Sequence, residues 1–147
     1  MANAYLALKQ KQQQEVDNFP FMFAFSNKQF EEGMAKLGLE ASDTDKIYSI
    51  GGGGYVRKTD SQAMGEMFER HAREMKEAIK SDTTGDGFIF EMFNYELGNH
   101  EYVITGDTGD TLDALGLTLE EVNASEKLKN GLRKAMNAQH EWLEKHG

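Results

Sequence analysis

The chain has no cysteine among its 147 residues, so disulfides, thiolate metal ligands and a cysteine nucleophile are excluded. Its single proline is Pro20, and it has no Pro/Ser-rich linker, internal repeat or low-complexity tail. No apolar run approaches the ~20 residues of a membrane span, and the N-terminus lacks the basic and apolar regions of a secretory signal. These absences predict one cytoplasmic domain over residues 1–147 without membrane contact.

Basic residues are missing from one long segment. Residues 81–126 contain 11 Asp and Glu and no Lys or Arg, in a chain whose net charge is −9. A surface of one sign attracts oppositely charged partners, although a solvated acidic face can also serve solubility alone. Phosphate contacts need a basic face, which only the last helix and a few bases of residues 60–80 offer. We therefore do not expect direct nucleic-acid binding.

Hydrophobic periodicity predicts an α+β fold dominated by helix. Five or six helices should surround a small, mostly antiparallel sheet of three or four short strands. Pairs of residues typical of helix starts stand at Ser26 and Gln29, Thr59 and Gln62, and Thr118 and Glu121. The longer predicted helices are 2–17, 27–37, 60–80, 88–100 and 127–145, and short helical segments are predicted at 111–115 and after Thr118. The predicted strands are 21–25, 46–50, 55–58 and 102–105. Residues 88–100 also fit a strand, but their length favours the helix.

Four consecutive glycines, Gly51, Gly52, Gly53 and Gly54, stand between two predicted strands. Backbone N–H groups of such a run can approach a phosphate or carboxylate, with Arg57 nearby as a charge. No phosphate-binding signature is matched, because a strand and not a helix follows. A hairpin turn that needs positive φ is the alternative, and we expect at least one positive φ there.

Two patterns suggest a cation. The loop from Asp82 begins like a calcium loop, but Phe93 occupies the position of the bidentate Glu, so a turn in which Asp86 caps the next helix is favoured. Glu96 and His100, at i and i+4, share a helix face and, with His71 or Glu101, would supply metal ligands. The alternative places His71 in the core as a hydrogen-bonded residue, since methionines and Phe68 share its helix face.

Three runs, FPFMFAFSNKQFEEG, YSIGGGGYVRKTDS and GFIFEMFNYELGNHEY, extend over much of the chain. They resemble a small family of unknown function carried by bacteriophages and mobile elements. The resemblance implies an accessory protein with a role in interaction with a host. It implies no reaction and no site residues.

We therefore expect a non-catalytic interaction protein without a cofactor. Its acidic segment should bind a basic protein, such as one that itself binds nucleic acids. The expected surface consists of Asp82, Asp86, Glu91, Glu96, Glu101, Asp107, Asp110 and Asp113. The alternative is a small metal- or anion-dependent enzyme or ligand-binding protein. The sequence leaves homo-oligomerisation open.

Overall fold

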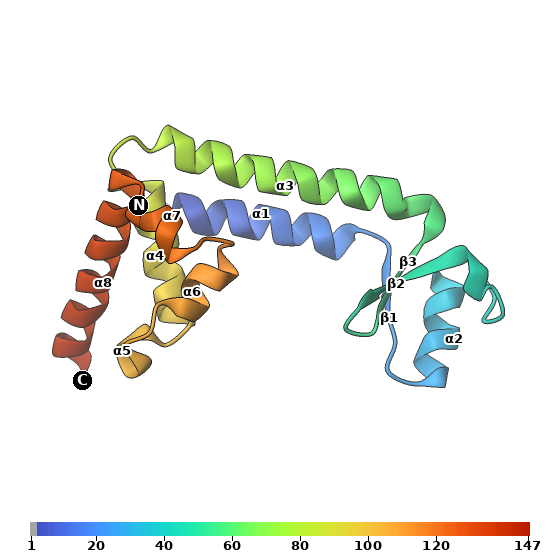
Figure 1. Cartoon of the computed structure of the whole chain (residues 1–147). Coiled ribbons are helices and arrows are strands. Elements are labelled where there is room, and N and C mark those ends of the chain that lie inside the picture. The colour runs from blue at the N-terminus through green and yellow to red at the C-terminus, as the bar shows by residue number, and fades with distance from the viewer. Residues whose placement is uncertain (1–2) are drawn as a thin grey trace. The chain divides into compact units, whose positions relative to one another are not determined.

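The computed structural model describes residues 3–147 and confirms a helix-dominated α+β fold (Figure 1). Of the chain, 69% is helical, and the described part contains eight α-helices and one three-stranded antiparallel sheet. The helices are α1 (Ala4–Asn18), α2 (Asn27–Lys36), α3 (Ser61–Ser81), α4 (Phe88–Asn99), α5 (Tyr102–Thr105), α6 (Gly109–Ala114), α7 (Leu119–Asn123) and α8 (Glu126–His146). The strands are β1 (Phe21–Phe23), β2 (Ile47–Gly51) and β3 (Gly54–Arg57). No described helix has the length and apolar character that a bilayer crossing requires.

The chain forms two compact units. Unit 1 contains the chain up to Gln12 together with Glu74–Gly147, and unit 2 is Gln13–Arg73. The boundaries fall within α1 and α3, so each of these helices contributes residues to both units.

Unit 2 is built around the small sheet. Its strand order is β1-β3-β2, with both pairs antiparallel, so the predicted hairpin of β2 and β3 is confirmed. Met22 of β1 is buried against α2, where a Cβ on Gly33 would lie 2.2 Å from the Met22 side chain. Glycine at this position therefore allows the helix to approach the strand. Met22 shares a small core with Met34, Leu37 and Ile47.

The glycine turn adopts the conformation that its composition predicts. Gly51, Gly52 and Gly53 have φ values of 86°, 59° and 79°. Side chains with a Cβ rarely adopt this region, because the Cβ meets the following carbonyl oxygen. The expected positive φ is confirmed, and the run serves the hairpin.

Unit 1 is organised around α4, which packs along α8. Residues 88–99 are helical, so the choice of helix over strand is confirmed. Ile89, Met92, Phe93 and Leu97 of this helix are fully buried. Gly131 of α8 faces Ile89, where a Cβ would lie 2.5 Å from the Ile89 side chain. The absence of a side chain at Gly131 thus permits the close helix contact.

The predicted strand at 102–105 is wrong. These residues form the single helical turn α5, flanked by Glu101 at φ 56° and Gly106 at φ 69°. Tyr, Val, Ile and Thr favour strands, but the two left-handed residues fold the segment into one turn, with Gly106 N–H donating to the Tyr102 carbonyl. Tyr102 becomes buried and packs within unit 1.

Two of the three predicted helix starts are confirmed. The Ser26 hydroxyl accepts from Gln29 N–H, and the Thr118 hydroxyl accepts from Glu121 N–H. The third is wrong, because a short 3₁₀ turn spans Lys58–Asp60 and α3 begins only at Ser61.

Candidate functional site

The eight acidic residues expected to form one surface have different environments in unit 1. Asp82 acts as a helix cap: its carboxylate accepts from the N–H groups of Thr84, Gly85, Gly87 and Ile89 at 2.9–3.2 Å. Burial acts to raise the pKa of Asp82, but the four backbone donors outweigh it and hold that pKa below its ordinary value. Asp82, and not Asp86 as predicted, therefore satisfies the start of α4.

Glu96 is not a surface residue. It is only 3% exposed, and its carboxylate accepts the Tyr5 hydroxyl at 2.7 Å and lies 3.2 Å from the Lys9 ammonium. Burial, followed by the nearby Glu96 carboxylate, raises the pKa of the Tyr5 hydroxyl. The expectation that Glu96 contributes to an interaction surface is therefore wrong, because a buried carboxylate needs internal partners.

Asp86 and Glu91 also have partners within unit 1. Asp86 accepts from Asn130 at 2.9 Å and forms an ion pair with Lys134, both on α8. The Lys134 ammonium holds the pKa of the Asp86 carboxyl below its ordinary value. Glu91 is half-buried and accepts the Ala4 N–H at 2.8 Å. Each of these two carboxylates therefore already has a partner within unit 1.

Five of the eight carboxylates are exposed: Asp86, which is paired with Lys134, and Glu101, Asp107, Asp110 and Asp113 of the segment that follows α4. The last four are considered together. They lie on the segment that contains α5 and α6, where the chain has no Lys or Arg. Asp107 uses one oxygen to accept from Gly109 N–H at 2.8 Å, which leaves its other oxygen available. These four define the exposed acidic segment.

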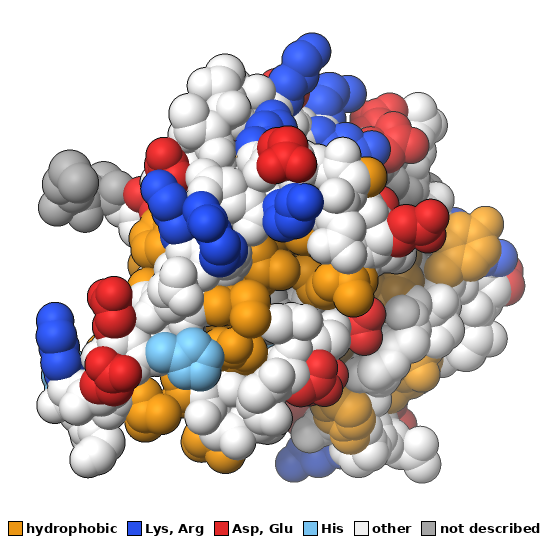
Figure 2. All heavy atoms as spheres, turned by 60° about the vertical axis from the view of Figure 1, so that its left-hand side comes forward, with side chains coloured by type: hydrophobic (Ala, Val, Ile, Leu, Met, Phe, Trp, Pro, Cys, Tyr) orange, Lys and Arg blue, Asp and Glu red, His pale blue; other side chains and the backbone are white. Residues whose placement is uncertain are grey.

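An apolar groove of about 400 Å³ adjoins this segment, between the end of α4, α5 and α8. Ile104 is 77% exposed and Trp142 is 54% exposed, and both line the groove. Glu101, at φ 56°, places a carboxylate at the same groove. On the face that carries α8, exposed hydrophobic side chains gather between acidic and basic ones (Figure 2).

Sequence periodicity missed this groove. Large apolar residues of an amphipathic helix usually face the core, whereas Trp142 and Leu143 are both exposed near the end of α8. The sequence contained no signal for the groove, because the exposure of Ile104 and Trp142 depends on tertiary contacts.

The basic residue of the glycine turn in unit 2 has partners within that unit. Arg57 donates to Asp60 at 2.7 Å and to the Leu37 carbonyl at 3.1 Å, so its guanidinium is engaged within the unit. The aromatic ring of Phe25 lies against Gly53, where a Cβ would be 2.5 Å from the ring. The hairpin explanation accounts for these contacts.

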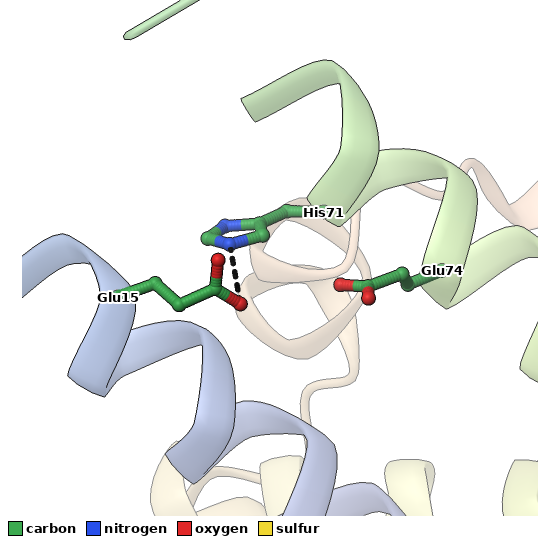
Figure 3. A group of neighbouring side chains, drawn as sticks. All are labelled: Glu15, His71 and Glu74. Carbon is green, nitrogen blue, oxygen red and sulfur yellow. Dashed lines mark ion pairs between the residues drawn. The ribbon is translucent and has the colours of Figure 1, made fainter. Parts of the chain in front are cut away.

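His71 is 8% exposed, as predicted for a core histidine, and its Nε2 lies 3.5 Å from a Glu15 oxygen (Figure 3). Glu15 also forms an ion pair with Arg70, whose hydrogen bonds lower the pKa of the Glu15 carboxyl. Within unit 2, Glu15 and His71 belong to the group of potential metal ligands found among the described residues. That group includes neither Glu96 nor His100. A cation at Glu15 would have to displace the Arg70 guanidinium.

Comparison with known proteins places the chain in a family. No curated protein and no solved structure shows a significant match to it. One family model matches residues 4–138, which cover every described helix and strand except the last turns of α8. The chain belongs to the family described as "Family of unknown function (DUF7659)".

Proposed function

We propose that this protein is a non-catalytic interaction protein that binds a basic protein segment through unit 1. The contact surface consists of the exposed acidic segment, Glu101, Asp107, Asp110 and Asp113, together with the apolar groove. The accessory role in a phage or mobile element that the resemblance implies is part of this proposal.

The observation that carries the proposal is the combination of exposed apolar groups and uncompensated acids. Ile104 and Trp142 expose large apolar surfaces in a groove, and Glu101 lines the same groove. Asp107 follows Ile104 by three residues. Interfaces combine an apolar centre with a polar rim, and aromatic residues are enriched at that centre. A partner with an apolar side chain flanked by Lys or Arg complements both features.

Contacts within unit 1 support a proposed surface limited to the second half of the one expected from sequence. Asp82, Asp86, Glu91 and Glu96 already bind groups of unit 1. The remaining acids have no basic residue between them in sequence, so their charges are not neutralised locally. We therefore propose binding at α5 and α6, and not over the whole of residues 81–126.

The test is capture of a basic protein from a lysate of the source cells, with two kinds of variant. Ile104→Ser with Trp142→Ser removes the apolar groups, and Asp107→Lys with Asp110→Lys reverses the charge. The matched control is Glu31→Lys with Glu32→Lys, which makes the same charge change at exposed positions of α2.

The proposal requires that one basic protein be captured by the wild-type chain and the control, and be lost from both surface variants. Circular dichroism verifies that all variants fold. A protein retained by both surface variants, or lost equally from the control, contradicts the proposed surface.

A further inference from the structure

A second recess in unit 1 has the opposite electrostatic character. It lies between the loop after α3 and the first turns of α8, with a volume of about 490 Å³. Three basic residues and one acidic residue, Glu126, line it, together with Thr83, Thr84 and Asn130; the basic residues are Lys127, Lys129 and Arg133. In Figure 2, basic side chains gather in the upper half of the face that carries α8. Three cationic side chains at one recess are notable in a chain of net charge −9.

Contacts between loop and helix hold the walls of this recess. Gly85, at φ 90°, approaches α8 so closely that a Cβ would lie 2.1 Å from the Lys127 carbonyl oxygen. Asn130 donates to the Thr84 carbonyl at 2.8 Å, and Asp86 of the loop is paired with Lys134. These contacts hold the loop against α8 and so define the shape of the recess within unit 1.

Two of the three cations are held by neutral groups. Lys127 donates to the carbonyl oxygens of Ile79 and Lys80 at 2.9 and 3.4 Å. Arg133 donates to the amide oxygen of Asn130 at 2.8 Å. These contacts orient the side chains, and none of the three accepting oxygens carries a formal negative charge.

The third cation has only a weak acidic partner. Lys129 lies 3.5 Å from Glu126, whose side chain is 94% exposed. An exposed pair at this spacing on a helix contributes only a few tenths of a kcal/mol. A ligand with two negative charges would therefore outcompete Glu126 for Lys129.

We infer that this recess binds the phosphate group of a small phosphorylated molecule. Arg offers a planar fork of donors that matches phosphate, and Lys adds a point charge. The Thr83 hydroxyl stands at the same recess as a further donor. The volume lies in the range of small-molecule sites and exceeds what one phosphate needs, which leaves room for the molecule that carries it. The site is distinct from the groove and does not depend on it.

Amide NMR titration of the full chain with inorganic phosphate, AMP and adenosine tests the inference. Phosphate and AMP should shift the amides of residues 83–84 and 127–133, and adenosine should not. A higher affinity for AMP than for inorganic phosphate identifies a phosphorylated molecule as the ligand class, whereas equal affinities restrict the site to free phosphate. Absence of these shifts, or equal binding of adenosine, overturns the inference.

Charge-removing variants test whether Lys129 and Arg133 contribute to AMP binding. Lys129→Gln with Arg133→Gln should weaken AMP binding by about tenfold or more, because each removes a charge-assisted contact. Lys28→Gln with Lys36→Gln makes the same charge change at exposed positions of α2 and should leave affinity within about twofold. Lys127 is left unchanged, since its contacts with α3 also support the fold. Equal losses in the two double variants would show an unspecific charge effect and reject the site.

Discussion

His71 illustrates how a polar residue becomes part of a core. Its ring is almost fully buried, packs edge-on against Phe68 at 6.2 Å, and contacts Glu15. We predict that His71→Ala lowers the free energy of unfolding by roughly 1–3 kcal/mol, through lost packing and a lost polar contact. Urea unfolding measures this, with His146→Ala, at an exposed position, as the control. An unchanged urea midpoint would contradict the structural role.

Tyr5 and Glu96 form a buried polar contact in unit 1. Tyr5→Phe removes the hydroxyl that donates to Glu96, so we predict a loss of roughly 1–3 kcal/mol at pH 7. Tyr48→Phe, at an exposed tyrosine, should change little.

The same pair predicts a pH dependence. Because the folded pKa of Tyr5 is raised, its contribution is fully present below the unfolded pKa of about 10 and is lost as pH rises beyond it. The stability difference between wild type and Tyr5→Phe should therefore shrink between pH 9 and ~11, measured by urea unfolding. A difference that grows with pH would contradict the assignment.

At the scale of the element, Asp82 determines how α4 begins. We predict that Asp82→Asn destabilises unit 1 by roughly 1–3 kcal/mol, because the amide replaces one accepting oxygen by a donor. The folded pKa of Asp82 is lowered, so its contribution is present above the unfolded pKa of about 3.9 and is lost as pH falls through the folded pKa. Urea unfolding should show a smaller difference at pH ~3 than at pH 7. Asp110→Asn, at an exposed position, should lack this effect.

The β2–β3 turn allows two glycines to be compared. Gly53→Ala should cost about 1 kcal/mol or more, because φ is positive and the new Cβ meets Phe25. Gly65→Ala should instead stabilise by roughly 0.5–1 kcal/mol, since Gly65 lies within α3 with open space around its Cβ position. Thermal or urea unfolding distinguishes the two. A stabilising Gly53→Ala would contradict the requirement for positive φ in the turn, and a destabilising Gly65→Ala would contradict the open space around Gly65.

Elements with strong local signals were predictable. Residues 88–99 and 61–81 carry long apolar stripes, and Ser26 and Thr118 occupy helix starts. The segment 102–105 was not predictable from propensity, because its helical turn depends on a left-handed Glu101, a conformation that non-glycine residues seldom adopt.

At the scale of the whole molecule, the charge distribution predicts how a partner arrives. If the exposed acidic segment directs association, the on-rate of a basic partner should fall steeply as salt rises through ~0.1 M, where the screening length is about 10 Å. Asp107→Lys with Asp110→Lys should lower the on-rate and flatten its salt dependence, measured by stopped flow or surface plasmon resonance. Glu31→Lys with Glu32→Lys should change it less. An on-rate that changes neither with salt concentration nor with charge reversal would contradict electrostatic attraction.

The sequence by itself determined the helix-dominated α+β class, the glycine hairpin, the burial of His71 and the absence of basic residues from 81–126. These features follow from periodicity, backbone freedom and composition, which are local properties of the chain.

Only the tertiary structure decided which carboxylates remain exposed. Glu96 and Asp110 both belong to the acidic segment of the sequence. Glu96 binds Tyr5 and Lys9, which lie 87 or more residues away along the chain, whereas Asp110 is exposed to solvent. The tertiary structure also leaves Trp142 exposed and places the Thr84 carbonyl within hydrogen-bond distance of the Asn130 side chain. Such contacts join residues far apart in the chain, and their energies depend on burial and distance, which local patterns do not contain.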